Sequence, residues 1–507
     1  MTASITVSRR SAVKLVGGLM LSAGCAAALP GVVDAAEADE PLRVGVHGTP
    51  ESALDPALGS ASMWTQTVAH NTMDTLAVLT GEGIEYRLAT SIEMNDDATE
   101  WTIVIRDDAV FHNGEPVTAD DVLYSLSYLA ANPAGMMGYA NVDFAASTSD
   151  GAQTVVLHLA QPQATLLEEG LAIMSLIFPE GTVSEDFGTD IGSGPYRLMS
   201  CSAETGAALE AFEGHWAGAP AIKNVEIVPI ADAATRMTAL QAGQIAFANT
   251  VSATDAATAP AGIEVLPGEA AHSSAFVFSL NCAMAPFDDP EVRRAFKQAV
   301  DRDQLVQTLF RGQGEAGNDV LGKGLPSYND AMEQTAYDPD TAAELFAAKG
   351  VTELTILTSE ITPGIRDSAT LLAQQLQKVG VTLNVSDIDA AALFSTSFDQ
   401  ISQHQIFATY LINRPFPAMA SLYTSAQSMY NYSQWADDAY NDLLNQAIAE
   451  PDADERTALW NEAEQMLHEE GGLVVWGYQY ELNAQVEGLT GVQIIQSVPL
   501  MAQATLA

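Results

Sequence analysis

The chain has 507 residues, which is long enough for two or three domains with a large apolar core. Its 65 Asp and Glu residues against 20 Lys and Arg give a formal net charge of -45, so its surface would repel DNA, RNA and anionic lipid headgroups. A hydrophobic fraction of 48% excludes a chain that is disordered throughout. We therefore expect an acidic globular protein with no nucleic acid partner.

Residues 1–38 have the pattern of an export signal and are kept out of the fold prediction. The stretch Ser8–Lys14, SRRSAVK, is similar to a twin-arginine export motif, with Ala where Phe is usual. The apolar run Leu15–Leu29 that follows is shorter than the ~20 residues that a membrane-spanning helix needs. Ala36–Ala38 has the A-x-A form of a cleavage site, which predicts a mature protein in the periplasm.

A second processing route is open at Leu21–Cys25, LSAGC, which is similar to a lipobox with Leu one place too early. Processing there would leave the protein anchored to the membrane by a lipid on Cys25. The later cysteines, Cys201 and Cys282, follow no recognisable spacing, so a disulfide between them is neither predicted nor excluded.

The mature chain opens with a predicted strand at Leu42–Val46, LRVGV. Loops at the carboxyl ends of strands are usual places for ligand contact in α/β folds, so Thr49 is a candidate ligand residue. A helix is expected over Met63–Asp74.

The most informative stretch begins with a strand at Trp101–Arg106, in which alternate residues are apolar. Asn113-Gly114 then predicts a tight turn, because Gly adopts positive φ without steric cost. Thr118, with Asp121 three residues later, predicts a capping box at the start of a helix. No residue of this strand, turn and helix needs to be reactive, so we interpret it as scaffold.

The segment Asn132–Tyr139 is rich in Gly and Met and is expected to be irregular, with Tyr139 a candidate for the wall of a pocket. Val155–Leu159 predicts a strand. Gly192–Tyr196, GSGPY, predicts a tight loop, but a strand follows it where a phosphate cradle would need a helix.

Strands and helices alternate in the rest of the chain, which is typical of α/β lobes. In the helix that begins at Pro290, Asp289 is the expected N-cap and proline holds its favoured first position. The expected strands are Val225–Ile230, Ala275–Leu280, Leu354–Leu357, Val381–Val385 and Leu473–Trp476, and the expected helices are Asp232–Ala242, Ile365–Val379, Asp437–Ala449 and Asp454–Leu467.

No catalytic or nucleotide-binding motif appears in a suitable context, so we expect neither an enzyme nor a cofactor. His47 and His272 lie near expected strand ends and would suit nickel or haem, but such histidines are more often simply hydrogen-bonded. Asp288-Asp289 is a helix cap rather than a catalytic pair. A secreted hydrolase is kept as a distant alternative, beside a chemoreceptor partner and an extracellular chaperone.

Several of these segments together identify a family. Phe111–Leu126, FHNGEPVTADDVLYSL, resembles the FHDGxPVTAxDVxxSL segment of the extracytoplasmic solute-binding proteins of the dipeptide, oligopeptide and nickel class, family 5. Gly192–Tyr196 resembles the GTGPY turn of that family, and Asp288–Val306 resembles its DvrVRqAlxxAiDrexlv helix. The resemblance extends over nearly all of residues 42–480.

This resemblance implies an α/β fold of the type II periplasmic binding protein class, with two lobes joined by a hinge and an extra small domain in the first lobe. It implies that the protein is the substrate-binding component of an ABC importer, a monomer that delivers a peptide or peptide-like solute to membrane permease subunits. The implied domains are residues 39–54, 190–272 and 482–507 for domain I, 55–189 for the small domain II, and 273–481 for domain III.

The resemblance also locates the ligand contacts. Ala408–Pro417, ATYLINRPFP, matches a stretch in which peptide-binding members hold the ligand's α-amino group with an Asp. Tyr410 takes the place of a Trp, and Asn413 takes the place of that Asp, which weakens a pairing with ammonium. Arg414 adds a guanidinium that suits a carboxylate, and Arg366, near the expected interface of the lobes, is a second candidate of this kind.

Two ligand classes therefore stay open, because Asn413 replaces the acid with which peptide-binding members hold the ligand's amino group. The first is a peptide or a peptide-like solute. The alternative is a non-peptide carboxylate, opine, sugar or metal chelate. On this reading, Asn413→Asp is expected to raise the affinity for peptides with free amino termini.

Overall fold

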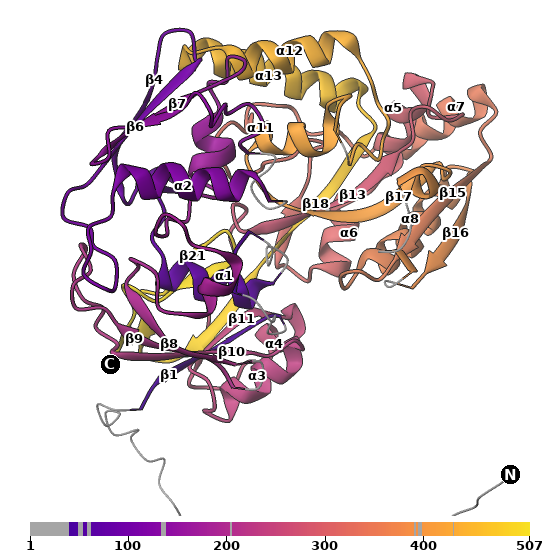
Figure 1. Ribbon diagram of the computed structural model, residues 1–507. Helices are drawn as coiled ribbons and strands as arrows, with labels where there is room; N and C mark the ends of the chain where they lie inside the picture. The colour runs from indigo at the N-terminus through magenta and orange to yellow at the C-terminus, as the bar shows by residue number, and fades with distance from the viewer. Residues whose placement is uncertain are drawn as a thin grey trace, which may run out of the picture. The chain divides into compact units, whose positions relative to one another are not determined.

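The computed structural model describes residues 40–48, 54–57, 62–132, 138–202, 205–389, 392–393, 398–428 and 430–507. The expected export signal and Thr49 lie outside these residues. Pro41–Ala507 forms one compact unit, which contains two large sheets (Figure 1).

The first large sheet has seven strands in the order β12-β19-β11-β1-β10-β9-β8. Its central strand β1 runs parallel to β10 and β11, and its other pairings are antiparallel. The strands are β1 (Leu42–Val46), β8 (Tyr196–Ser202), β9 (Gly206–Ala211), β10 (Asn224–Pro229), β11 (Phe247–Val251), β12 (Ile263–Val265) and β19 (Leu482–Val486).

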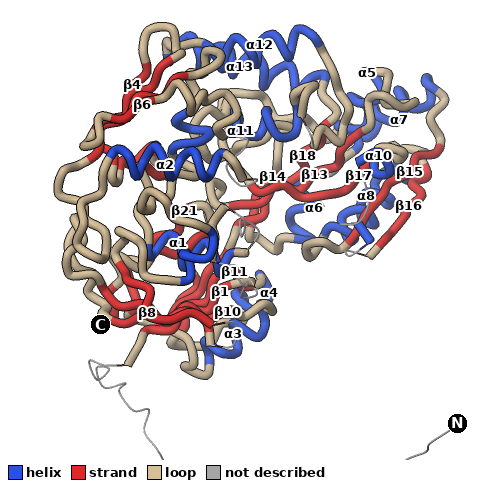
Figure 2. The backbone as a smooth tube through the Cα atoms, in the orientation of Figure 1, coloured by secondary structure: helices blue, strands red, loops and turns tan. Residues whose placement is uncertain are grey.

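Helices α3 (Ala233–Gln241) and α4 (Ala253–Ala257) pack against this sheet at β11 and β19 (Figure 2). Helix α1 (Met63–Thr72) packs against β1, β8 and β10, although we expected its residues in the small domain. Trp64 of this helix is fully buried, and its indole N–H donates a hydrogen bond to the carbonyl of Ile227 in β10. Helix α1 thus belongs with the first sheet by its packing.

The small domain is built on a four-stranded sheet in the order β4-β5-β7-β6, with helix α2 (Ala119–Ala130) against β6 and β7. The capping box is present as expected, since the side chain of Thr118 accepts from the Asp121 amide and the Asp121 carboxylate accepts from the Thr118 amide. The other elements are β2 (Ala77–Thr80), β3 (Gly83–Tyr86), β4 (Ala89–Met94), β5 (Glu100–Ile105), β6 (Thr148–Ser149), β7 (Thr154–His158), the π-helix η1 (Leu167–Leu171) and the 3-10 helix η2 (Ser184–Gly188).

The turn before helix α2 joins the small domain to the first sheet. Gly114 adopts a φ of +88°, as the Asn-Gly turn predicts. His112, in the same turn, fixes it to the segment before β8: one ring nitrogen lies 2.5 Å from Asp190 Oδ1 and the other 3.0 Å from the carbonyl oxygen of Gly194. Gly192 must be glycine because an added Cβ would lie 1.7 Å from the carbonyl oxygen of Thr72. The two family-like segments are therefore one structural junction.

The second large sheet has six strands in the order β14-β18-β13-β17-β15-β16. Helices α6 and α8 cover one of its faces, α5 packs against α7, and α13 packs against α12 and α5 (Figure 2). Its strands are β13 (Ser273–Leu280), β14 (Gly314–Ala316), β15 (Glu353–Ser359), β16 (Thr382–Ile388), β17 (Ile406–Ile412) and β18 (Leu473–Tyr480). Its helices are α5 (Pro290–Ala299), α6 (Arg302–Leu309), α7 (Pro339–Lys349), α8 (Ile365–Lys378), α10 (Phe398–Ile401), α11 (Phe416–Met419), the π-helix η3 (Ala420–Thr424), α12 (Asp438–Ala449) and α13 (Ala453–Glu470).

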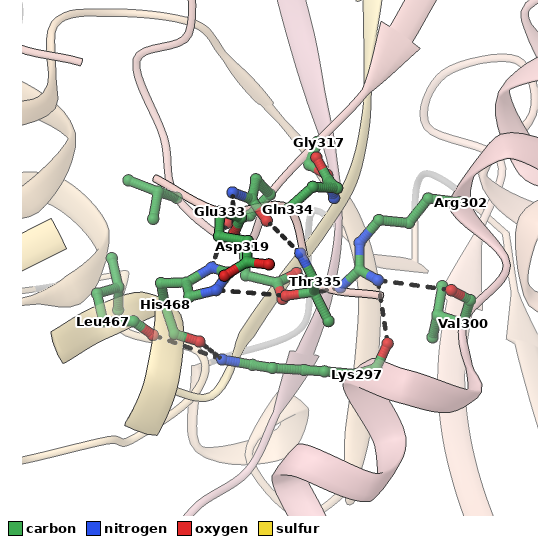
Figure 3. A network of polar contacts seen from close by, with 12 residues as sticks. Lys297, Val300, Arg302, Gly317, Asp319, Glu333, Gln334, Thr335, Leu467 and His468 are labelled. Atoms are coloured by element: carbon green, nitrogen blue, oxygen red, sulfur yellow. Dashed lines mark hydrogen bonds and ion pairs between the residues drawn. The ribbon is translucent and has the colours of Figure 1, made fainter. Parts of the chain in front are cut away.

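A buried polar network fixes the helices of this second lobe (Figure 3). Nη2 of Arg302 lies 2.7 Å from both oxygens of Asp319, which also accepts from the hydroxyl of Thr335 at 3.3 Å. Nζ of Lys297 donates to the carbonyl of His468 at 2.5 Å, at the end of helix α13. Burial lowers the pKa of Lys297 to about 8. These contacts join α5, α6 and α13 without involving the space between the lobes.

Two crossover segments join the two large sheets. Residues 266–272 lead from β12 to β13, and Glu481 alone separates β18 from β19. The segments lie side by side, because the amide of Glu481 donates to the carbonyl of His272 at 2.9 Å and that of Leu266 donates to the carbonyl of Asn483 at 2.9 Å. Short paired crossovers of this kind permit one lobe to rotate against the other.

The remaining hairpins lie near the C-terminus: β20 (Leu489–Thr490) with β23 (Thr505–Leu506), and β21 (Gln493–Ile495) with β22 (Val498–Leu500). Cys201 and Cys282 are both free thiols. Among the helices of the described residues, none is long and apolar enough to cross a membrane.

Candidate ligand-binding site

A cavity of about 370 Å³ lies between the two lobes at the crossover segments. A volume of this size is in the range of small-molecule sites, about 300–1,000 Å³. The first lobe contributes helix α1, the β2–β3 turn, the segment around η1 and the β21–β22 turn. The second lobe contributes Ala271–Ser273, the end of β17 with the loop after it, and helix α11 with η3.

Arg414 follows strand β17 and lines the cavity, as the sequence predicts. Arg414 is an exposed residue by its solvent-accessible surface, but the atoms packed around its side chain partly desolvate the guanidinium, and this desolvation lowers its pKa. Among the described residues, none forms a hydrogen bond or an ion pair with its guanidinium. The planar fork of Arg414 is therefore free to hold a carboxylate in two parallel hydrogen bonds.

Asn413 also lines the cavity, but its side chain is committed to the protein. Its Nδ2 group donates to the carbonyls of Ala270 at 3.0 Å and Lys323 at 2.8 Å, and its Oδ1 accepts from the amide of Gly322 at 3.1 Å. One amide hydrogen thus ties the end of β17 to the crossover 266–272, and the other ties it to the loop at Lys323. An aspartate could not donate these two bonds, so Asn413→Asp would leave the carbonyls of Ala270 and Lys323 without their donor.

Two carboxylates line the cavity, and the sequence analysis named neither. Glu481 comes from the β18–β19 crossover and Glu169 from helix η1. Burial raises the pKa of Glu481, and burial with the nearby Glu168 raises the pKa of Glu169 to about 7. In each residue one buried carboxylate oxygen has no hydrogen-bond partner among the described residues, Oε2 in Glu481 and Oε1 in Glu169.

The two histidines that line the cavity are His70, from helix α1, and His272, from the crossover. Burial lowers the pKa of His70 to about 4 and also lowers the pKa of His272. Both rings are therefore neutral at pH 7, and Arg414 is the one lasting positive charge among the described lining residues. No group of three or more His, Cys, Asp and Glu that could hold a metal ion occurs in the described parts of the chain.

The other predicted contacts lie away from the cavity lining. Tyr139 is buried behind the wall, where its hydroxyl donates to the carbonyl of Met174, a lining residue. Tyr410 lies on β17 and packs against Phe276, with ring centroids 6.4 Å apart. Arg366 lies at the surface in an ion pair with Asp387 at 2.8 Å. The structure thus brings Asn413 and Arg414 together at the cavity and places these three outside its lining.

The tip of the β21–β22 hairpin was also missed by the sequence analysis. Gln496 and Ser497 line the cavity with φ angles of 50° and 70°, as the two central residues of a tight hairpin turn require. A contact with Ser497 partly offsets the effect of burial on the pKa of Glu481. Neither residue is the Gly or Asn that would signal such a turn in the sequence.

Residues 83–433 match the family model described as bacterial extracellular solute-binding proteins, family 5 middle. The chain belongs to this family. Its members are substrate-binding components of ABC importers and are not enzymes, so the hydrolase alternative is set aside. The type II periplasmic binding protein fold that the sequence implied is confirmed.

Relatives and solved structures of the family match nearly the whole chain. The glutathione-binding protein GsiB of Shigella flexneri is 26% identical over 499 residues, covering 94% of this chain and 96% of that protein. The substrate-binding protein CtaP of Listeria monocytogenes has a TM-score of 0.80 at 22% identity, covering 92% of this chain and 99% of that one. NikA from Brucella suis, solved with Fe(III)-EDTA, has a TM-score of 0.80 at 18% identity, with 92% and 100% covered.

Proposed function

We propose that this family 5 solute-binding protein captures a short peptide or a peptide-like solute in the interlobe cavity and delivers it to the permease subunits of an ABC importer. The observation that carries this proposal is the charge pattern of the cavity. One unpaired guanidinium, Arg414, and two incompletely paired carboxylates, Glu169 and Glu481, line a single enclosed space. A solute that carries both an acid and an amine satisfies both signs of charge.

The ligand class is supported by one relative as well. GsiB, which matches the chain over nearly its whole length, is named for binding glutathione, a peptide-like solute with carboxylates and an amine. Glutathione is therefore the first defined compound to test. Its binding is a question for experiment, since at 26% identity the pocket residues of two proteins can differ.

The experiment is retention of solutes by the purified mature protein. The protein is equilibrated with glutathione and a mixed peptide digest, washed by ultrafiltration, and its bound solutes are identified by native mass spectrometry. We expect stoichiometric retention of a small peptide or of glutathione. A protein that retains no compound of either kind, in a preparation shown to be folded, would contradict the proposal.

A non-peptide carboxylate, such as an opine, is the second candidate, because the guanidinium of Arg414 can pair with any carboxylate, whether or not the solute is a peptide. The same experiment separates the two when the mixture includes amino-sugar acids and dicarboxylates without an amide.

We further propose that the mature protein is a periplasmic monomer, exported by its twin-arginine motif. Size-exclusion chromatography with light scattering tests the monomer.

A further inference from the structure

Glu481 occupies the crossover between the lobes and faces the cavity from there. It is the single residue between β18 and β19, and its amide is fixed to the carbonyl of His272 in the other crossover at 2.9 Å. Its side chain is a lining residue of the cavity. Its backbone is therefore fixed at the crossovers that join the two lobes, and its side chain enters the cavity from there.

The carboxylate of Glu481 lacks the cation that pairs with the buried acid Asp319. Asp319, which is fully buried, has Arg302 at 2.7 Å from both of its oxygens. Glu481 has no cation within 4 Å among the described residues, and its Oε2 is buried without a hydrogen bond. A buried acid without a countercharge is unfavourable, so the site gains when a positive group arrives.

Arg414 has the complementary deficiency, since none of the described residues offers it a carboxylate within 4 Å. The two charges share one cavity but do not form an ion pair with each other. A ligand that carries opposite charges at some distance from each other is the simplest solute that compensates both.

Two other residues are less suitable for the positive end of such a ligand. The side chain of Asn413 is neutral, and both its amide hydrogens and its oxygen already bond to the backbone of the protein. It therefore offers no negative charge and no free acceptor to an ammonium group. Glu169 already accepts from Nε2 of Gln163 at 3.2 Å, and its charge is disfavoured by Glu168 beside it.

We propose that Glu481 binds the ammonium group of the ligand at the hinge, while Arg414 binds its carboxylate. This inference rests on the proposed function and narrows its substrate class to solutes with a free, protonated amine. The family resemblance locates the contact with the ligand's amine at Asn413, in the loop after β17. Our proposal locates it instead at Glu481, in the crossover between the lobes.

The test is a competition among modified forms of one peptide library. Wild-type protein is equilibrated with equal amounts of di- and tripeptides in three forms: free amine, N-methylated and N-acetylated. Methylation keeps the positive charge while adding bulk, whereas acetylation removes the charge. Ultrafiltration and mass spectrometry then report the retained fraction of each form. We expect the free and methylated forms to be retained at least tenfold more than the acetylated form.

Variants assign that preference to a residue. Glu481→Gln, which keeps the shape of the side chain, is expected to reduce the preference for charged forms to less than threefold. The matched control Glu462→Gln, at an exposed position of helix α13, is expected to keep it. Retention of acetylated peptides by wild type as strongly as free peptides would overturn the inference, and so would a full preference in Glu481→Gln. Loss of the preference in Glu169→Gln alone would move the amine site to Glu169 and also overturn it.

The outcomes distinguish this inference from the proposed function. If wild type retains peptides without regard to the amine, the receptor function stands and the role of Glu481 falls. If wild type retains no peptide in any form, both fall. Melting curves by circular dichroism check that each variant is folded, and the wild-type comparison of the three forms needs no variant.

Discussion

Arg414 and Asn413 are adjacent in the chain, but their side chains have different surroundings. Asn413 is enclosed by three backbone groups of the protein, whereas Arg414 projects into the cavity without a described partner. The sequence placed both at the ligand because it could show only that they replace the family's usual residues. Which of the two is free to meet a ligand depends on Ala270, Gly322 and Lys323, which lie far away in the chain.

Replacing Arg414 tests the carboxylate contact. Removing one partner of a desolvated charge pair costs about 2–5 kcal/mol, so Arg414→Ala should weaken ligand binding by roughly 30-fold or more. Arg414→Lys should recover only part of this loss, because an ammonium lacks the planar fork. Calorimetry with the solute identified by retention measures both. Arg366→Ala is the matched control, since Arg366 pairs with Asp387 at the surface, and its affinity should equal that of wild type.

Replacing Asn413 tests its role in fixing the crossover. In Asn413→Asp two partly buried carbonyls, those of Ala270 and Lys323, lose their donors and face a carboxylate. We expect the free energy of unfolding to fall by about 1–3 kcal/mol, with no gain in affinity for free amines. Urea denaturation measures the change. Asn445→Asp, at an exposed position of helix α12, serves as control, and an equal loss there would argue against the assigned role.

At the scale of single elements, the sequence predicted most of what local chemistry decides. The strand Leu42–Val46 has the expected bounds, and the capping box at Thr118 and the proline at the start of helix α5 are where they were expected. Each of these signals depends on residues only a few positions apart, so it can be read from a single sequence. The cavity could not be predicted in this way, because His70, Glu169, Arg414 and Glu481 meet only after the lobes have formed.

One signal for Glu481 was nevertheless present. A single acid stands between two apolar runs, Leu473–Tyr480 and Leu482–Val486, which the structure shows to be consecutive strands of different sheets. An acid inside an apolar stretch needs a reason, and the crossover supplies one. The expected strand ended at Trp476, so this position was read as a domain boundary and its charge was not considered.

The packing of helices α12 and α13 leads to a prediction about pH. Glu464 of α13 is fully buried, accepts one hydrogen bond from the Asn329 amide at 2.8 Å, and leaves Oε1 without a partner. Burial raises its pKa from the usual 4.5 of a glutamate to about 9. The folded state therefore holds this proton more tightly, and the stability it confers is present below about pH 4.5 and lost as the pH rises toward 9.

Glu464→Gln should remove this dependence, because the amide stays neutral at every pH. We expect the variant to be more stable than wild type at pH 8, on the order of 1–3 kcal/mol, with a much smaller difference at pH 5. Thermal melts at the two pH values measure it. Glu462→Gln, an exposed change on the same helix, should show no such difference between the two pH values. A Glu464→Gln variant that gains nothing at pH 8 would contradict the buried neutral acid.

At the scale of the molecule, the lobes meet at a point away from the crossovers. The amide of Ala164, in the small domain, donates to the carbonyl of Ile448 at the end of helix α12 at 2.6 Å. A ligand that contacts both lobes should favour this closed arrangement. Saturation at a hundredfold excess over Kd should raise the free energy of unfolding by about 2.7 kcal/mol. Small-angle scattering should also show a smaller radius of gyration with ligand, and equal dimensions in both states would count against the hinge.

Export is a second property of the whole chain. If the proposed twin-arginine signal carries the protein, replacing both Arg9 and Arg10 by lysine should leave the precursor in the cytoplasm. Fractionation followed by immunoblotting measures this. Normal export of the double variant would show that the general secretory route carries the protein.

The position of strand β19 has a consequence for how the chain acquires its structure. Residues 482–486 lie between β11 and β12 in the first sheet, although the rest of that sheet is complete in sequence by residue 265. The second sheet, by contrast, is drawn from the continuous stretch Ser273–Tyr480. During synthesis the lobe encoded later can finish first, while the lobe encoded earlier keeps a gap between β11 and β12 until β19 emerges from the ribosome. A nascent chain of this protein therefore has an incomplete first sheet until residues 482–486 are available to pair.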